Sequence, residues 1–240
     1  MKLVIDHLTR YGYDEEVKFS TQYLRLTPRS SGRQKITAWT LTLPDGSAVA
    51  TTDAWGNVLH VLTLDNPHKE ITIRASGIVD IVEEGEEIGA EPQELLSPLV
   101  FLRCTPLTRA DGPIREFAQR WYQPEAQEAS LNRLMTELLL RMPYSPGATQ
   151  VQDSAADAFA RSKGVCQDHT HVFLACCRAL AIPARYVSGY LLTRPPPGQA
   201  RLIGADASHA WVSLYCPENG WVDFDPTNDL LPDLEHITLA

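Results

Sequence analysis

Long apolar runs are missing from this 240-residue sequence. No stretch approaches the roughly 20 consecutive apolar residues that a transmembrane helix needs. The N-terminus, Met1-Lys2-Leu3-Val4-Ile5-Asp6, has an apolar stretch too short for a signal peptide. We therefore expect a cytoplasmic protein that does not insert into membranes.

Basic residues are scarce relative to acidic ones. The chain has 21 Lys and Arg against 30 Asp and Glu, a formal net charge of −9. This surplus of negative charge argues against nucleic acid and anionic membrane as partners. The sequence does not predict the oligomeric state.

Cysteines are few, and their number is odd. The spacing of the five does not suggest a disulfide framework, and reduced thiols fit the cytoplasm. Cys176 and Cys177 lie in an apolar run, where cysteine behaves as a small hydrophobic residue. We expect Cys104 and Cys216 to be structural too, which leaves Cys166 as the candidate nucleophile.

Familiar metal motifs are also missing, because the sequence contains no Cys-x-x-Cys pair and no His-Glu-x-x-His helix. A zinc site remains an alternative, with ligands drawn from Cys166, His169, His171, His209 and Cys216. However, His169 and His171 are two positions apart and would point to different sides of a helix. We expect no metal and no cofactor.

The first third of the chain reads as β-structure. Short runs rich in Val, Ile, Thr and Leu alternate with turn residues, which is typical of a sandwich or small barrel. The predicted strands are Leu3–Tyr11, Thr21–Thr27, Lys35–Leu43, Val58–Leu64, Lys69–Ala75 and Gly77–Val82. The acidic segment Glu83–Pro98 contains Gly and Pro and is predicted to connect two domains, 1–90 and 91–240.

Helical spacing begins after this connection. Asp111 precedes a predicted short helix, and Asp153 or Ser154 is expected to cap another over Ala155–Arg161. Between them runs an apolar stripe that we assign to the core: Leu131, Leu134, Met135, Leu138, Leu139 and Met142. The predicted fold class is therefore α+β.

Cys166 stands between Gly164 and a long apolar run. That run, Val172–Ala181, has Arg178 as its only charged residue, so it predicts a buried helix that ends at Pro183. Cys166 should lie in the first turn of this helix. The free backbone N–H groups there carry partial positive charge and favour a thiolate.

A hairpin is predicted over Ser208–Thr227, because two alternating runs flank a turn. A loop centred on Pro217 would place His209 across from Asp225. A two-residue turn at Asn219-Gly220 would place Leu214 there instead and would mix the polar and apolar faces, so we favour the longer loop. Asp223 shares the face of Asp225 and is its rival.

Three motifs carry a family resemblance: Gly164-Val165-Cys166, Ser208-His209-Ala210-Trp211 and Asp225-Pro226-Thr227. They resemble the transglutaminase-like superfamily, most closely its bacterial cysteine-protease-like group, which also has an N-terminal β domain. The turn Asp53–Asn57 resembles one in that domain. The resemblance implies a β-sandwich-like domain followed by a papain-like core, with a central helix packed on an antiparallel sheet.

The resemblance also implies a reaction, thiol acyl transfer on peptide or protein amides. Cys166 would be the nucleophile, His209 the base and acid, and Asp225 the group that orients the imidazole. With water as the acceptor the protein would be a cysteine peptidase or amidase, which we expect. One alternative is a protein-glutamine transglutaminase that uses an amine, and another is a non-catalytic peptide-binding module with a relict site.

Further residues are candidates for supporting roles. The Cys166 backbone N–H could stabilise an oxyanion, Tyr144 resembles an aromatic partner in the family, and Gln167 is a third candidate unless it points away along the helix. Trp211 and Trp55 are candidates for lining a substrate cleft. For Trp55 the simpler interpretation is that it anchors a glycine turn.

Overall fold

The computed structural model describes residues 1–82, 96–192 and 208–240. The chain divides into two compact units, Met1–Leu95 together with His236–Ala240, and Leu96–Glu235. The predicted domain boundary after residue 90, and most of the predicted connection, lie outside the described residues. The last five residues group with the first unit.

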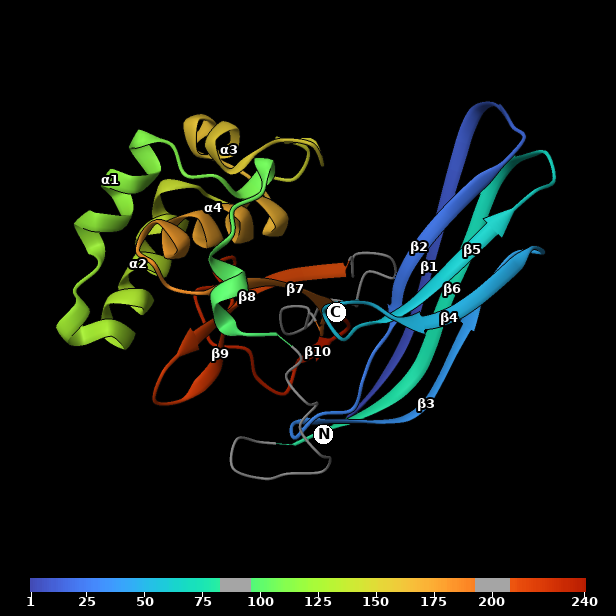
Figure 1. Ribbon diagram of the computed structural model, residues 1–240, viewed down its shortest axis with the longest axis horizontal. Helices are drawn as coiled ribbons and strands as arrows, with labels where there is room; N and C mark the ends of the chain where they lie inside the picture. Colours follow the sequence, from blue (N-terminus) through green and yellow to red (C-terminus); the bar gives the residue numbers. More distant parts are fainter. Residues whose placement is uncertain (83–95, 193–207) are drawn as a thin grey trace, which may run out of the picture. The chain divides into compact units, whose positions relative to one another are not determined.

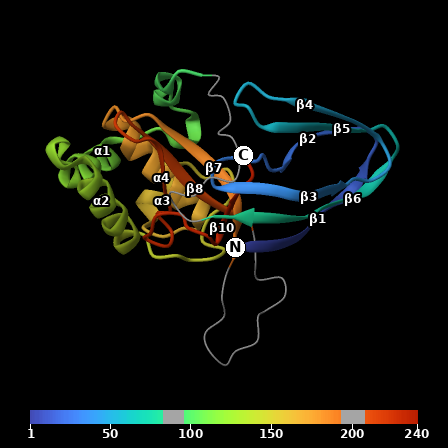
Figure 2. The ribbon, with the colours of Figure 1, turned by 90° about the horizontal axis from the view of Figure 1, so that it is seen from below.

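The N-terminal unit consists of two antiparallel sheets that form two layers (Figure 2). One sheet has the order β1 (Lys2–Val17), β6 (His68–Ile81), β3 (Gln34–Thr42), and the other β2 (Ser20–Thr27), β5 (Val58–Leu64), β4 (Ser47–Thr52). Leu24, Leu62 and Leu64 share a core with Ile71 and Ile73. The short strand β10 (His236–Thr238) is held here by Gln34, whose side chain bonds both the backbone N–H and the carbonyl of Thr238.

Gly77 explains why one prediction in this unit was wrong. We expected two strands separated near Gly77, but β6 runs through it without a break. Gly77 pairs with Trp39 on β3, and a Cβ at Gly77 would lie 2.2 Å from the indole atom Cε3. Glycine is therefore present to admit the Trp39 ring and not to end a strand.

The second unit is built around one helix, α4 (Cys166–Ala179), which lies beside an antiparallel sheet (Figure 1). Around it lie α1 (Gly112–Trp121), α2 (Gln127–Arg141) and α3 (Ala155–Arg161), with the 3-10 turns η1 (Pro98–Leu102), η2 (Pro106–Thr108) and η3 (Pro124–Ala126). The strands β7 (Ala184–Leu191), β8 (Ser208–Cys216) and β9 (Gly220–Phe224) pair in that order. The predicted α+β class is confirmed.

The helices begin where the sequence predicted caps. The Asp111 carboxylate accepts a hydrogen bond from the Ile114 backbone N–H at 3.0 Å. Ser154 caps α3, because its hydroxyl accepts from the Asp157 N–H at 3.2 Å while the Asp157 carboxylate accepts from the Ser154 N–H at 3.1 Å. These reciprocal bonds satisfy donors that a helix leaves unpaired at its start.

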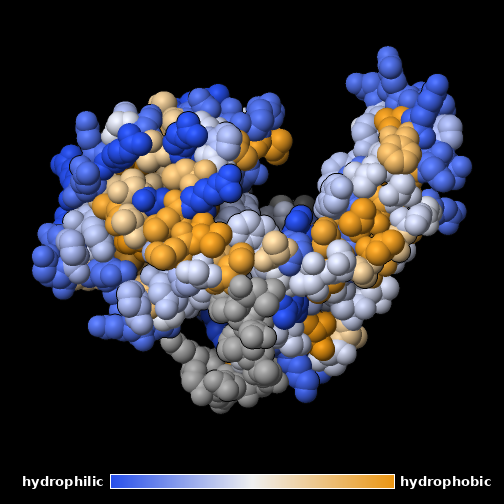
Figure 3. Space-filling model, in the orientation of Figure 1, coloured by the Kyte–Doolittle hydropathy of each residue, from blue (hydrophilic) through white to orange (hydrophobic). Residues whose placement is uncertain are grey.

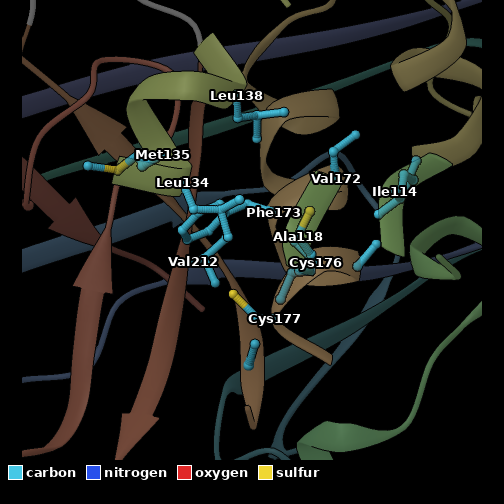
Figure 4. Packing of buried hydrophobic residues seen from close by; sticks show 14 of the residues in the cluster. Ile114, Ala118, Leu134, Met135, Leu138, Val172, Phe173, Cys176, Cys177 and Val212 are labelled. Atoms are coloured by element: carbon cyan, nitrogen blue, oxygen red, sulfur yellow. The ribbon is translucent and has the colours of Figure 1, made fainter. Parts of the chain in front are cut away.

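The core of the second unit surrounds α4 (Figure 4). Val172, Phe173 and Cys176 of α4 are fully buried with Leu134 and Leu138 of α2. The predicted α2 stripe is buried except at Leu139, which is only partly covered. Burial raises the pKa values of both Cys176 and Cys177, so these thiols stay protonated and pack as hydrophobic groups, as predicted.

Arg178, the one charge in the apolar run, is a structural anchor. Its guanidinium donates to the Phe101 carbonyl at 2.9 Å, the Thr108 hydroxyl at 2.7 Å and the Ala184 carbonyl at 2.8 Å. The side chain therefore ties η1, η2 and the start of β7 to the helix. A partly buried arginine is tolerated here because each of its three nitrogens donates a hydrogen bond.

Apolar side chains also reach the surface in both units (Figure 3). Tyr23 of β2 and Leu99 of η1 are examples. Single exposed apolar residues are normal in folded proteins. Among the residues that the structure describes, none of the helices combines the length and apolar character needed to cross a bilayer.

Candidate active site

The start of α4 is shaped by Asp168, which is almost fully buried. Its Oδ2 accepts from the Val165 backbone N–H at 2.8 Å and from the Thr149 hydroxyl at 2.6 Å. A Cβ at Gly164 would lie 2.6 Å from the Asp168 Cβ. Glycine therefore leaves room for the capping carboxylate, and Cys166 follows as the first residue of the helix.

His209 and Asp225 form a buried pair. His209 Nε2 lies 2.7 Å from Asp225 Oδ2, and the two side chains are 9% and 0% exposed. Asp225 Oδ1 also accepts from the backbone N–H groups of Thr227 at 3.0 Å and Asn228 at 3.3 Å, and the Asn228 amide donates to Oδ2 at 2.7 Å. A buried carboxylate can remain charged when it is satisfied in this way.

Cys166 completes the group through a hydrogen bond to His209. Burial lowers the pKa of His209, but the hydrogen bonds to Asp225 and Cys166, together with their charges, raise it to about 9. The imidazole therefore holds a proton at neutral pH. The structure thus brings Cys166, His209 and Asp225 together.

The hairpin register corrects one expectation. Val212 pairs with Phe224 and Cys216 with Gly220, so the loop has three residues and is centred on Glu218, not Pro217. The polar and apolar faces separate as predicted. Continuing this register would place Trp211, and not His209, across from Asp225. Asp225 lies just beyond the end of β9, where it forms a β-bridge with Leu230. His209 therefore contacts Asp225 as a diagonal neighbour and not as its directly paired residue.

Asp223 has another partner and is not the residue that orients His209. Its Oδ2 accepts from Trp211 Nε1 at 3.1 Å. Trp211 is fully buried, with its ring 6.0 Å from the His209 ring. The prediction that Trp211 lines a cleft is therefore wrong, because its side chain has no exposed surface and packs beside His209.

The other predicted supporting residues differ in their surroundings. The Gln167 amide donates to the Val151 carbonyl at 3.0 Å, so this donor is already used within the protein and is a poor candidate for stabilising an oxyanion. Tyr144 is half exposed and bridges Gly164. Its pKa is raised by burial and by the charge of Cys166, which places it near the thiol. Trp55 lies in the N-terminal unit beside Asp53, which accepts its backbone N–H at 2.9 Å; its role in a cleft stays a prediction.

Sequence reasoning missed several neighbours of the site. Asn228, Thr227 and His169 all contact the group or its supports. The sequence had offered Thr227 only as the last residue of the third motif and His169 only as a candidate zinc ligand, and Asn228 was not singled out. His169 Nε2 donates to the Met142 carbonyl at 2.7 Å, and Nδ1 lies 3.2 Å from the Thr227 hydroxyl. Both nitrogens are thus engaged by the protein, which argues against the zinc alternative.

Tyr186 of β7 also lies near the thiol. Burial raises its pKa, with smaller contributions from the charges of Cys166 and Asp168. Its ring packs against the buried ring of His171, with centroids 5.6 Å apart. Tyr144 and Tyr186 therefore present two phenols in the surroundings of Cys166.

Two family models match this chain. The bacterial transglutaminase-like N-terminal region matches residues 3–80, and the transglutaminase-like superfamily core matches residues 115–226. An uncharacterised protein of Mycobacterium bovis is 33% identical over 256 residues, which covers 98% of this chain and 82% of the relative. A protein-glutamine gamma-glutamyltransferase of Pseudomonas aeruginosa is 31% identical over 126 residues, covering 52% of this chain and 19% of the relative.

A solved structure supports the same fold. A protein of Cytophaga hutchinsonii, provisionally named a cysteine protease, superposes with a TM-score of 0.78 at 22% identity and covers all of this chain and 81% of the other. At this identity the likeness concerns the fold alone. The three residues grouped around the start of α4 lie in, or at the edge of, the segment matched by the core model.

Proposed function

Because the chain belongs to the transglutaminase-like superfamily, with the bacterial N-terminal region before the core, we propose that it is a cysteine-dependent acyl-transfer enzyme acting on peptide or protein amides. One observation carries the proposal. A partly exposed thiol at a helix start hydrogen-bonds an imidazole whose other side meets a buried carboxylate at 2.7 Å. This is the arrangement of nucleophile, base and orienting group that acyl transfer requires.

The reaction follows from the positions of the protons. The proton that His209 holds is the one given up by the Cys166 thiol, and the sulfur attacks the amide carbonyl to form a tetrahedral oxyanion. Backbone N–H groups in the first turn of a helix lack intrahelical partners, so those at the start of α4 are candidates to stabilise this charge. His209 then gives the proton to the leaving amine as the C–N bond breaks, and a thioester on Cys166 remains.

The acceptor that cleaves the thioester decides the type of enzyme. We propose water, activated by His209, because Cys166 is partly open to solvent and excluding water is what would favour an amine. The enzyme would then be a peptidase or amidase. The similarity of half of this chain to a protein-glutamine gamma-glutamyltransferase supports the alternative, in which an amine takes the acyl group.

A peptide-library digest with and without a small primary amine tests both versions. The full chain is compared with Cys166→Ala, and mass spectrometry separates cleavage, deamidation and amine incorporation. We expect cleavage or deamidation that the variant abolishes. Amine incorporation as the main product would support the transglutaminase alternative. The enzyme proposal fails, in favour of a relict binding site, if the wild type turns nothing over and Cys166 is alkylated no faster than the exposed Cys104.

A further inference from the structure

His169 is a fully buried histidine one helical turn after the candidate nucleophile. Its two nitrogens hydrogen-bond to different parts of the chain, the Met142 carbonyl at 2.7 Å and the Thr227 hydroxyl at 3.2 Å. A carbonyl only accepts, so Nε2 carries the proton, and a neutral ring then accepts at Nδ1 from Thr227. Burial lowers the pKa of His169, which keeps this ring neutral.

Both hydrogen-bond partners of His169, Thr227 and Met142, are connected to residues of the candidate active site. The Thr227 backbone N–H donates to Asp225 Oδ1 at 3.0 Å, so one residue contacts both the carboxylate and His169. On the other side, Met142 begins a segment that carries Tyr144. This segment is fastened to the start of α4 by Ser145, whose N–H donates to the Gly164 carbonyl at 2.8 Å.

We propose that His169 is a positioning residue that joins the Asp225 loop to the segment carrying Tyr144, and so fixes both relative to Cys166. The inference rests on the function proposed above, because positioning matters only if the thiol is activated. His169 does not itself touch the thiol chemistry. It acts through the Thr227 hydroxyl, which fixes the orientation of the loop Asp225–Leu230 and so the position of the Asp225 carboxylate beside His209. A small displacement of an orienting group lowers the reaction rate strongly in such sites.

The two hydrogen bonds can be removed one at a time. Thr227→Val deletes the hydroxyl and keeps the backbone N–H that Asp225 needs, whereas Thr227→Ser keeps both. In His169→Asn the amide can still accept near the Nδ1 position, and in His169→Gln it can still donate near the Nε2 position. The matched control is Thr170→Val on the same helix, since the Thr170 hydroxyl is buried without a partner among the described residues.

The readout is the rate at which iodoacetamide alkylates Cys166 in the full chain, measured by peptide mass spectrometry. At about pH 6.5 we expect Thr227→Val to slow alkylation by roughly three- to tenfold, the usual effect of one lost hydrogen bond. At about pH 9.5 the difference should shrink, because thiols then ionise without help. Thr227→Ser should restore the rate, and His169→Gln should resemble Thr227→Val more closely than His169→Asn does.

The outcomes separate the two proposals. If wild-type Cys166 reacts no faster than Cys104, the proposed function fails. If wild-type Cys166 is fast and Thr227→Val matches Thr170→Val at both pH values, the proposed function stands and the positioning role of His169 is overturned. An equal loss for Thr227→Val and Thr227→Ser would overturn it too, because the hydroxyl would then not be the cause.

Discussion

The charge of Asp225 keeps the proton on His209. Burial alone would lower the pKa of this imidazole, and the bond to Asp225 is the largest opposing effect. In Asp225→Asn the negative charge is gone, so we expect the pKa of His209 to fall from about 9 towards its ordinary value. Alkylation of Cys166 near neutral pH should slow by roughly fourfold, since an imidazole with the ordinary pKa of 6.5 is only about a quarter protonated at pH 7. Proton NMR titration, with His209→Gln to assign the signal, measures the shift.

Asp223→Asn is the matched control for this prediction. Asp223 lies on the same hairpin, but its carboxylate accepts from Trp211 and not from His209. Its replacement should leave the titration of His209 nearly unchanged. Equal shifts in the two variants would mean that the general negative charge of the hairpin, and not the bond at Asp225, sets the pKa.

The prediction of Cys166, His209 and Asp225 came from three motifs and the family that they resemble, with residue spacing in support. The period of two placed His209 and Asp225 on matching faces, and the glycine before Cys166 indicated a helix start. Thr227, Asn228 and His169 could not be found in this way. Their contacts depend on how the chain turns after β9, where Asp229 adopts a left-handed backbone conformation, φ 56°, that the pattern did not indicate.

At the scale of elements, the start of α4 depends on the space above Gly164. In Gly164→Ala the new Cβ would lie 2.6 Å from the Asp168 Cβ and 2.8 Å from its Oδ2. The carboxylate would have to leave the Val165 N–H and the Thr149 hydroxyl that it now caps. We expect a loss of about 2 kcal/mol in the free energy of unfolding, typical of overpacking, and slower alkylation of Cys166.

Gly112→Ala controls for glycine replacement at a helix start. Gly112 is the first residue of α1, and a Cβ there would meet nothing within 4 Å. Alanine favours helix over glycine by up to about 1 kcal/mol, so this variant should be neutral or slightly more stable. Denaturant unfolding compares the two. A Gly164→Ala protein as stable as Gly112→Ala would show that Asp168 moves aside freely.

The strands show what sequence patterns settle and what they leave open. The alternation of residue types predicted which side chains share a face of the β8–β9 hairpin. The predicted pairing of the two strands was wrong by two positions, because several loop lengths preserve the same faces. Gly220, the first residue of β9, follows the loop with φ 72°, a left-handed conformation that glycine adopts readily. The strand β4 was not predicted, since every residue from Ser47 to Thr52 is exposed and no buried face imposes a pattern.

At the scale of the whole molecule, composition and pattern predicted the α+β class and the order of a β unit before a helix-rich unit. They could not predict that His236–Ala240 groups with the N-terminal unit. Nothing local in that short segment indicates its contact with Gln34, which is 204 residues away from Thr238. Contacts of such long range are set by the folded structure as a whole.

The raised pKa of His209 also predicts how stability depends on pH. A folded-state pKa of about 9, above the ordinary 6.5, means that folding favours the protonated imidazole. This contribution is fully present below about pH 6.5 and is lost as the pH rises through 9, with an upper limit of roughly 3 kcal/mol. Hydrogen exchange, corrected for its intrinsic pH dependence, should show falling protection in α4 and β8. Peptides from β5 and β6 serve as an internal reference, because His209 belongs to the other unit. His209→Gln should remove the dependence, and a wild-type profile flat between pH 6.5 and 9 would contradict the raised pKa.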